Sequence, residues 1–474
     1  MTAFHSQTAW FAKPYRTLSL AFLIVVLLLF TLSQNLKPNG PPAFRADGAP
    51  PGDLQATEAK DKPATATLSA SVDRVSESPP RWSWWPGRDR NNHALNVEQC
   101  DSAFPDLYHE IDRSAAFWRE RNGGRKITKD QYKLDWSEDG GISIMIYDQQ
   151  LYVTYSRGLN DFLHWEERSK ATLQNINRAV LTSPDPVPNM EFSVKINDRY
   201  GLTAKFPNAT TWVFSRNITD VAMKQVWLMP DFNFWSYPRV AGSYADFQRQ
   251  TLRIGDDFAA KEDKLVWRGT INFNFKLRDA LIQQTKHQPW ADVRKVAEDS
   301  NDEESLRNHI SMPDHCKYKY TIHTEGWAWS GRLKYLWSCH SVIFIHHLVH
   351  HTHLYHLLES SGPKQNYVQV ENNFSDLPAK MEALLADPAE ARRIADVTAE
   401  TFRDRYVTPA AQTCYWRRLL TVWASMTEEV DPWETVHVDG SVERRWRGMT
   451  FEEYIFHKDD YPVQPNKAKV KNTR

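Results

Sequence analysis

Hydrophobic and polar positions along the chain alternate in two successive blocks, each with strand-like and helix-like spacing. In the first block the pattern predicts two strands around a turn at 142–156, a helix at 161–181, and strands at 190–198 and 210–215. In the second it predicts strands at 264–270, 317–326, 341–346 and 365–370, and helices at 275–286, from about 331, and at about 375–386, 388–405 and 409–427. Strands that alternate with helices in this way indicate two α/β domains with parallel sheets.

An uncharged apolar run from Thr17 to Ser33 precedes both blocks. As a helix it would be roughly 25 Å long, enough for a thin bilayer. We therefore predict a cytoplasmic tail at 1–16 and a transmembrane signal anchor at 17–34, with the apolar region of a signal peptide as the alternative. Residues 35–95 are rich in Pro, Ala, Ser and Thr, which predicts a disordered stem.

Cysteines and glycosylation sequons occur only beyond this apolar run. An even number of cysteines can pair in an oxidising compartment, and Asn-x-Ser/Thr is the acceptor pattern for N-glycans. The cysteines are Cys100, Cys316, Cys339 and Cys414, and the sequons lie at Asn208, Asn217 and Asn373. Together they predict a single-pass type II protein of the Golgi or endoplasmic reticulum membrane, with its globular head in the lumen.

Net charge and aromatic content narrow the class of partner. The formal net charge of −1 gives no support to a nucleic-acid partner, which would favour a basic surface. The chain contains 19 Trp, and flat aromatic rings suit the faces of sugars. A tryptophan is nevertheless more often a core residue than a sugar platform, so no single one is assigned on this ground.

Polar residues follow the predicted strands at the ends where α/β enzymes carry their ligands. Asp198 follows one strand, Arg268 with Gly269 another, and the segments 326–332 and 367–373 follow two more. Glycines beside a helix start, followed by Arg332, would suit a diphosphate, whereas the alternative is a capped helix with a solvated arginine. Asp198 is either a general base or the first residue of a turn.

Six histidines between His346 and His356 have helical spacing in part, which raises the possibility of a metal site. No His-Glu-x-x-His pattern accompanies them, so we expect no metal here. The chain also lacks an Asp-x-Asp pair, which sugar transferases commonly use to hold a metal. We therefore expect arginines, rather than a metal cofactor, to neutralise a diphosphate.

Several segments, taken together and in order, resemble one known family. They are "MEFSVKINDR", "FNFWSYP", "LVWRGT", "HCKYKYTIHTEGWAWSGRLKYLWSC" and "NNFSDL". This order is similar to that of glycosyltransferase family 90, which includes the fungal capsule-associated xylosyltransferases and the Rumi-type protein O-glucosyltransferases. The resemblance covers most of 96–430 and is greatest to the fungal branch.

The resemblance implies a GT-B-like α/β fold, with two Rossmann-type domains that face a cleft. They would be an N-terminal acceptor-side domain at 96–240 and a C-terminal UDP-sugar-binding domain at 241–430, followed by a C-terminal tail at 431–474. It also implies an inverting transfer from an α-linked donor.

The resemblance further assigns roles to residues. Asp198 would be the catalytic base, and Arg268 with Gly269 would contact the diphosphate. Trp235 and Pro238 would lie on the acceptor side, and the disulfides would be Cys316–Cys339 and Cys100–Cys414. The UDP-sugar loop would be Trp327, Ala328, Trp329, Ser330, Gly331 and Arg332, although the Rumi-type loop has small residues where this chain has the two tryptophans.

We therefore predict an enzyme that moves xylose or glucose from a UDP-sugar to a hydroxyl of a glycan or glycoprotein. Its partners would be that donor, that acceptor and, through one N-terminal helix, a membrane. The alternatives are an inactive lumenal sugar-binding protein on the same scaffold and a metal-dependent hydrolase that uses the histidine run. If Asp198 is not the base, Asp231 and Glu371 are the next candidates.

Overall fold

The computed structural model describes residues 82–134, 140–159, 164–198, 206–238, 240–296, 303–457 and 459–462. All of them belong to the second of two units in the chain, Glu77–Arg474. The predicted cytoplasmic tail, membrane anchor and first part of the stem lie outside these ranges. Across the described part of the chain, no helix is both long enough and apolar enough to span a bilayer.

The end of the predicted stem is ordered, which corrects the boundary at residue 95. Helix α2 (Pro86–Asp89) begins there with a proline in its first turn. Trp84 packs edge-to-face on Phe104, with ring centroids 4.7 Å apart, and donates from Nε1 to the Asp404 carbonyl at 3.1 Å. Tryptophans in this polar segment therefore anchor it to the globular part.

The first sheet is mixed rather than parallel, and its order is β17-β2-β1-β3-β4-β6. Strands β17, β2, β1 and β3 pair antiparallel, and β3, β4 and β6 pair parallel. A two-residue turn with positive φ at Asp148 and Gln149 joins β1 to β2 and forces them antiparallel. The strands are β1 (Gly141–Tyr147), β2 (Gln150–Arg157), β3 (Met190–Lys195), β4 (Trp212–Val213), β6 (Trp227–Leu228) and β17 (Met449–Thr450).

The second sheet is fully parallel, as predicted, and its order is β10-β9-β11-β12-β14. The strands are β9 (Glu262–Gly269), β10 (Ala291–Lys295), β11 (Tyr318–His323), β12 (Val342–His346) and β14 (Val368–Val370). Strand β10 lies on one side of β9, and β11 with the later strands lies on the other, so the direction of strand addition reverses between β9 and β11. The order therefore corresponds to 2-1-3-4-5 of a doubly wound sheet. Such sheets bind ligands outside the carboxyl ends of the two strands at this switch point.

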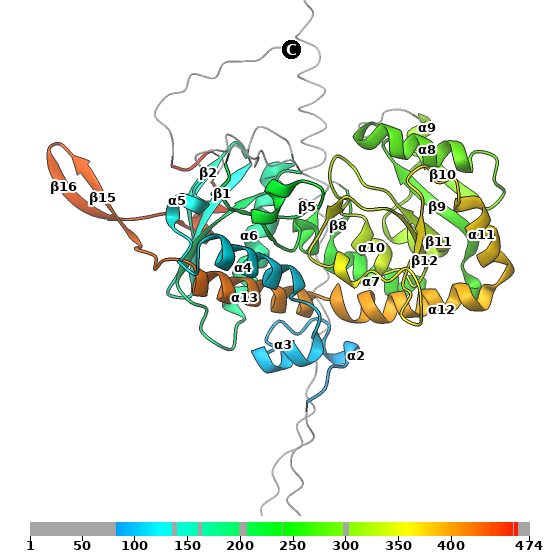
Figure 1. The fold of residues 1–474 in the computed structure, drawn as a ribbon, viewed down its shortest axis with the longest axis horizontal. Coiled ribbons are helices and arrows are strands. Elements are labelled where there is room, and N and C mark those ends of the chain that lie inside the picture. The colour runs from blue at the N-terminus through cyan, green and yellow to red at the C-terminus, as the bar shows by residue number, and fades with distance from the viewer. Residues whose placement is uncertain are drawn as a thin grey trace, which may run out of the picture. The chain divides into compact units, whose positions relative to one another are not determined.

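Helices cover both sheets (Figure 1). Most lie where the apolar spacing predicts them, including α6, α8 and α11 to α13. The helices are α3 (Val97–Ala103), α4 (His109–Arg121), α5 (Lys129–Tyr132), α6 (Trp165–Leu181), α7 (Tyr244–Ile254), α8 (Phe275–Thr285), α9 (Glu303–Asn308), α10 (Leu333–Trp337), α11 (Leu377–Ala386), α12 (Pro388–Thr398), α13 (Pro409–Met426) and α14 (Phe451–Tyr454). Short 3-10 helices include η2 (Phe232–Phe234) and η5 (Pro313–Lys317).

The C-terminal part of the chain returns to the first sheet. Helix α12 continues as the π-helix η7 (Ala399–Tyr406), and α13 then packs against α6, α4 and β3, so that α12 and α13 lie end to end in Figure 1. The predicted tail at 431–474 is structured over most of its described length. It forms the hairpin β15 (Trp433–Val438) and β16 (Ser441–Trp446), which extends away from the first sheet in Figure 1, and the edge strand β17.

Each sheet has its own core. The first sheet packs with α13 around Trp212, whose ring stacks on Phe192 at 3.9 Å and meets Trp423 edge-on at 5.5 Å. The second sheet packs with α8, α11 and α12. Many tryptophans are thus core residues, as the sequence suggested, and seven are fully buried: Trp118, Trp212, Trp227, Trp267, Trp337, Trp416 and Trp423.

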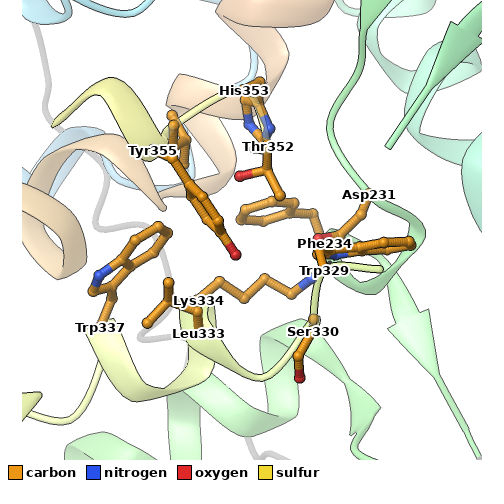
Figure 2. A pocket seen from close by; sticks show the side chains of 12 residues that line it. Asp231, Phe234, Trp329, Ser330, Leu333, Lys334, Trp337, Thr352, His353 and Tyr355 are labelled. Carbon is orange, nitrogen blue, oxygen red and sulfur yellow. Dashed lines mark hydrogen bonds and ion pairs between the residues drawn. The ribbon is translucent and has the colours of Figure 1, made fainter. Parts of the chain in front are cut away.

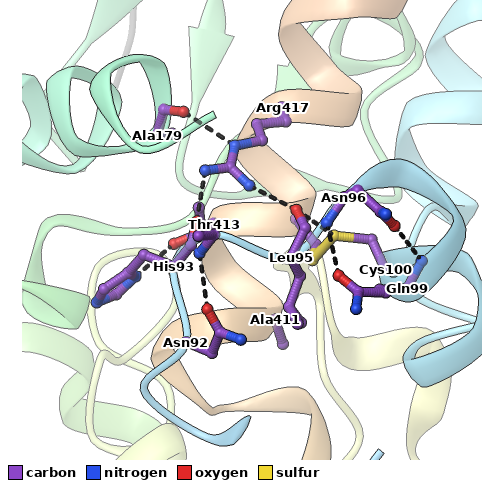
Figure 3. The surroundings of a disulfide bond; sticks show 12 residues. Asn92, His93, Leu95, Asn96, Gln99, Cys100, Ala179, Ala411, Thr413 and Arg417 are labelled. Atoms are coloured by element: carbon purple, nitrogen blue, oxygen red, sulfur yellow. Dashed lines mark hydrogen bonds between the residues drawn. A yellow bond between two sulfur atoms is a disulfide. The ribbon is translucent and has the colours of Figure 1, made fainter. Parts of the chain in front are cut away.

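Both predicted disulfides are present, Cys100–Cys414 and Cys316–Cys339. Cys100–Cys414 joins α3 to α13 across 314 residues of sequence, and Figure 3 shows its surroundings. Beside it Arg417 donates to the carbonyls of Ala179 at 2.9 Å and Leu95 at 2.8 Å. The N-terminal segment is therefore fixed to α13 by a covalent bond and by charge-assisted hydrogen bonds.

Candidate functional site

The carboxyl ends of β9 and β11 form the site that the switch point predicts. Strand β9 ends with Arg268 and Gly269, and β11 is followed by Thr324 and the loop 326–332. Trp267 ties the two strands together, because its Nε1 donates to the Thr324 hydroxyl at 3.1 Å. The predicted UDP-sugar loop thus lies directly beside the end of β9.

Arg332 is the cation of this loop that lacks a partner. Its Nε and Nη1 atoms are buried and have no hydrogen-bond partner among the described residues. Burial, and then the charge of Arg278, lowers the pKa of Arg332 to about 9. The guanidinium lies 5.6 Å from the ring centre of Trp267 and beside Gly269, where an added Cβ would be 3.2 Å from its Nη2. Gly269 therefore leaves room for the arginine.

The helix after the loop is short and begins close to the predicted start near residue 331. It begins at Leu333 and has five residues, with Arg332 as an N-cap that makes no side-chain cap hydrogen bond. The guanidinium of Arg332, rather than the end of a long helix, is therefore the positive group that the loop presents.

A second arginine, which the sequence analysis did not single out, approaches the same strand ends. Arg278 of α8 donates from Nε to the Glu325 carbonyl at 3.0 Å and from Nη1 to the Thr270 carbonyl at 2.5 Å. Its guanidinium is 5.9 Å from the Trp267 ring centre, and burial lowers its pKa to about 10. Neither Arg278 nor Arg332 forms an ion pair within the described ranges, so two uncompensated cations meet at the switch point.

Arg268, the other arginine predicted to bind a diphosphate, is fully engaged within the protein. It donates to the carbonyls of Asn308, Trp267 and Asp292, and Nη2 binds both oxygens of the Asp292 carboxylate at 2.8 and 2.9 Å. All three nitrogens of the guanidinium therefore donate within the protein. In this structure Arg268 holds β9 to β10 through an ion pair with Asp292, so its role as a diphosphate ligand stays a prediction.

The two tryptophans of the loop have different environments. Trp327 is 48% exposed and meets Phe273 edge-on, with ring centroids 5.2 Å apart. Trp329 and Ala328 are buried, and the Trp329 ring lies 5.5 Å from that of Phe214. Trp327 is thus the loop aromatic that a ligand can reach, whereas Trp329 holds the loop in place.

Asp198 lies just beyond β3 in the other half of the protein. Its Oδ1 accepts from Nη1 of Arg168 at 2.8 Å, and its side chain is 33% exposed. Burial opposes the charge of Arg168, but Asp198 and Tyr237 outweigh burial and raise the pKa of this arginine. Arg168 also packs over the Phe232 ring at 4.9 Å. The carboxylate is therefore oriented by a fixed cation and remains accessible to solvent.

The acceptor-side residues that the resemblance assigns lie in a segment that packs against α6, the helix that carries Arg168. Trp235 is half-buried, with the guanidinium of Arg178 of α6 4.5 Å from its ring centre, and Pro238 is exposed. Burial lowers the pKa of Arg178 to about 10. Trp235 is thus, like Trp327, a partly exposed aromatic residue.

A small cavity lies beneath the loop, between α10, η2 and residues 352–355 (Figure 2). Lys334 extends from α10 into it and forms an ion pair with Asp231, and both side chains are more than nine-tenths buried. Burial lowers the pKa of Lys334 to about 8 although Asp231 opposes the shift. Asp231, one of the two alternative candidates for the catalytic base, is thus already paired with a lysine. The other, Glu371, is exposed, and its Oε1 lies 3.8 Å from Nε2 of His347.

Comparison with known proteins identifies the family. The family model described as glycosyl transferase family 90 matches residues 97–444, which is well over half of the chain. The chain belongs to glycosyl transferase family 90.

Relatives of this family 90 chain include human protein O-glucosyltransferase 1, 25% identical over 380 residues that cover 75% of this chain and 89% of that protein. The O-glucosyltransferase rumi homolog of Anopheles gambiae is 29% identical over 216 residues, 41% of this chain and 51% of that protein. The chain thus spans about half the length of the Anopheles relative. A sucrose-phosphate synthase structure from Thermosynechococcus elongatus gives a TM-score of 0.28 at 15% identity, over 44% of this chain and 57% of that one, too low to establish a shared fold.

The histidine run of this family 90 member does not form one helix, and only His356 lies in a helical turn, the 3-10 helix η6 (Tyr355–Leu357). His346 ends β12, and its Nε2 accepts from the Glu325 backbone at 3.1 Å. His350 and His351 form the short strand β13 (His350–His351), which pairs with β5 (Arg216–Asn217). His353 is buried, with its Nε2 2.9 Å from Oε1 of Gln412. The histidines therefore have separate structural contacts, and the described residues contain no cluster of three metal-ligating side chains.

The predicted glycosylation sites differ in accessibility. Asn208 and Asn373 are exposed. Asn217 is half-buried in β5, and its Oδ1 accepts from the backbone and hydroxyl of Thr219 at 2.9 and 2.7 Å. All three remain predictions, with Asn208 and Asn373 the more accessible of them.

Proposed function

We propose that this family 90 protein is an inverting glycosyltransferase that moves xylose or glucose from a UDP-sugar to a hydroxyl of a glycan or glycoprotein. Family membership supports the reaction class. The observation that supports a donor-binding site is that two buried nitrogens of Arg332, at the switch point of the parallel sheet, have no hydrogen-bond partner in the described part of the chain. An unpaired buried cation is costly, so a site that keeps one is suited to an anionic ligand.

The charge and geometry of this site fit the diphosphate of a nucleotide sugar. Arginine forms two parallel N–H···O bonds with a phosphate, and Arg332 has free donors for such a contact. Arg278, over the same Trp267 ring, adds a second positive charge. As the bond from the sugar to UDP breaks, both arginines would stabilise the negative charge that develops on the leaving diphosphate.

Asp198 is the proposed general base. The acceptor hydroxyl would transfer its proton to the Asp198 carboxylate while its oxygen forms the new bond to the anomeric carbon, and UDP would depart from the opposite face with the bonding electron pair. Arg168 would orient the carboxylate through the 2.8 Å ion pair. The assignment of Asp198 comes from the family resemblance, and its partial exposure supports access by an acceptor.

The two arginines can supply the charge stabilisation that a divalent metal supplies in other transferases. We therefore expect turnover to survive a chelator. The two disulfides support an oxidising compartment for the head, in agreement with the predicted lumenal topology. A glycosidase-sensitive shift in gel mobility of the full chain, expressed in a secretory host, would support this topology, and an unmodified protein with free thiols would contradict it.

The direct test is UDP release from a panel of UDP-sugars with candidate acceptors, with and without chelator. Asp198→Asn keeps the shape of the side chain and removes the proton acceptor, so we expect transfer to fall about 10²–10⁴-fold with UDP affinity little changed. Asp220→Asn is the matched control, because this exposed carboxylate caps the 3-10 helix η1 (Val221–Gln225) and asparagine caps equally well.

Two outcomes would contradict the proposal. A folded Asp198→Asn variant that transfers sugar at more than about a tenth of the wild-type rate would exclude Asp198 as the base. A wild-type protein that binds UDP-sugars but never releases UDP would indicate a sugar-binding protein instead.

A further inference from the structure

The loop that carries Arg332 and the acceptor-side segment 231–235 are held together by buried contacts. We propose that the Lys334–Asp231 ion pair is a positioning device that sets the donor loop against the acceptor-side segment. The inference rests on the proposed function, because it assigns the two surfaces to a donor and an acceptor. Neither Lys334 nor Asp231 is assigned to touch the donor.

The ion pair connects the two halves of the protein at the base of the loop. Lys334 follows Arg332 by two residues in α10, so its position fixes the backbone that carries the unpartnered guanidinium. On the other side, Asp231 caps η2, because its Oδ1 accepts from the Asn233 backbone at 2.9 Å. The lysine Nζ also lies 4.5 Å from the ring centre of Phe234. The carboxylate is thus rigid within its own segment, and Lys334 docks onto it.

Two further contacts place the loop in the same position. An added Cβ at Gly331 would lie 2.5 Å from Nδ2 of Asn233, so the loop backbone packs directly on this side chain and only glycine fits without a shift. The buried ring of Trp329 contacts Phe214, which in turn meets Phe232 edge-on at 5.4 Å. Trp329, Gly331 and Lys334 thus all face the segment that leads to Trp235.

An ion pair at this place is better explained by position than by stability. A buried pair contributes little net stability compared with an apolar contact of the same volume, whereas removal of one partner leaves an unpaired charge. The cavity beside the pair contains further polar groups, and the Tyr355 hydroxyl points into it in Figure 2. That hydroxyl and Nδ1 of His353 are buried and have no hydrogen-bond partner in the described part of the chain. The surroundings of the pair are therefore not a plain apolar core.

The test compares Lys334→Met with Arg447→Met. Arg447 forms an equally buried ion pair with Glu191 in the first sheet, with side chains 11% and 4% exposed, and it lies in neither surface. We expect Lys334→Met to weaken UDP affinity, measured by calorimetry, and to lower turnover of UDP-glucose and UDP-xylose about 10–100-fold, because a misplaced binding group is costly. Arg447→Met should lower the melting temperature without changing UDP affinity.

Hydrogen exchange supplies a second readout that does not depend on donor chemistry. Lys334→Met should increase exchange at 329–337 and 231–235 together, while Arg447→Met should leave both segments protected. If Lys334→Met does not fold, the double variant Asp231→Asn with Lys334→Met removes both charges and leaves no unpaired one. The positioning role predicts that this double variant folds and still loses UDP affinity.

The outcomes separate the inference from the proposed function. A folded Lys334→Met with unchanged exchange and unchanged UDP affinity would overturn the positioning role, as would an equal loss of UDP affinity in Arg447→Met. If Asp231→Asn abolished transfer and left UDP affinity and exchange at 329–337 unchanged, Asp231 would be a base instead. If the wild type neither bound UDP nor released it, the proposed function would fail, and the exchange comparison would still test the contact.

Discussion

Arg268 and Arg332 lie at the same end of the second sheet, yet the protein uses them in opposite ways. All three guanidinium nitrogens of Arg268 donate to carbonyls or to the Asp292 carboxylate, and so join β9 to β10. Arg332 keeps Nε and Nη1 without a partner beside Gly269. The same resemblance assigned both residues to the diphosphate, so the residue type alone did not separate a structural arginine from a ligand-binding one. The number of internal partners does.

The comparison predicts opposite effects on stability and on binding. Arg268 donates to three carbonyl oxygens and to the Asp292 carboxylate, and its loss leaves those carbonyls without this donor, whereas Asp292 keeps Arg294 and Tyr318. An unpartnered arginine carries a cost in the free protein that its ligand removes. Substitution of Arg268 should therefore reduce the stability of the fold, and substitution of Arg332 should reduce the affinity for UDP.

The largest expected effect is on folding, in Arg268→Met. Arg268 donates to the carbonyls of Asn308, Trp267 and Asp292. A buried acceptor left without its donor costs about 1–3 kcal/mol, so we expect a loss of about 3–5 kcal/mol of unfolding free energy by denaturant titration. The double variant Arg268→Met with Asp292→Leu should recover little of it, because Asp292 keeps Arg294 and Tyr318 as partners in the single variant. If Arg268→Met kept its stability and lost UDP affinity, the result would show that Arg268 is a diphosphate ligand.

The next effect is on affinity, in Arg332→Met. Loss of an arginine–phosphate contact should weaken UDP binding by about 1.5–3 kcal/mol, measured by calorimetry. The melting temperature should stay the same or rise, because a buried charge without a partner is removed. Arg268→Met is the matched control for both quantities. Unchanged UDP affinity in Arg332→Met would show that the free donors of Arg332 do not bind the nucleotide.

How much of the fold could be predicted differs between the two sheets. The second sheet followed from apolar strands that alternate with helices, and β9, β11 and β12 lie where the pattern put them. In the first sheet the turn within 142–156 was predicted, but the prediction of a parallel sheet was wrong, because a two-residue turn at Asp148 and Gln149 makes β1 and β2 antiparallel. The return of β17 from beyond residue 431 is a long-range pairing that local patterns do not contain.

Some residues of the candidate site could be located from the sequence and others could not. The loop before α10 and the strand-end Asp198 could be located from the sequence, since both follow apolar runs. Arg278 could not, because it lies within an ordinary amphipathic helix and gains its position only when α8 packs beside Trp267. The histidine run begins in β12, where the sequence predicted a strand, but the short strand β13 at His350 and His351 was not predicted.

The smallest expected effect is on stability in acid, and it involves His315, a buried residue of η5. Arg332 and Arg268 both lower the pKa of this histidine. Burial is the main cause that lowers this pKa to about 3, and Arg332 lowers it more than Arg268 does. Because the folded pKa lies below the ordinary 6.5, the unfolded chain binds an extra proton between these values. Stability therefore falls as pH drops through this window, by about 1.4 kcal/mol per pH unit for this one group.

His315→Gln keeps a polar side chain and removes the titration, so it should lose this part of the acid dependence while the remaining buried histidines keep theirs. The measurement is the difference in unfolding free energy between wild type and variant from pH 7 to pH 4. The same comparison of His with Gln at position 315 is then made in the Arg332→Met and Arg268→Met backgrounds. The difference in unfolding free energy should shrink more in Arg332→Met, because Arg332 lowers the pKa of His315 more than Arg268 does. Equal shrinkage in both would mean that the two arginines act alike on this end of the sheet, and an unchanged acid slope in His315→Gln would place His315 outside their influence.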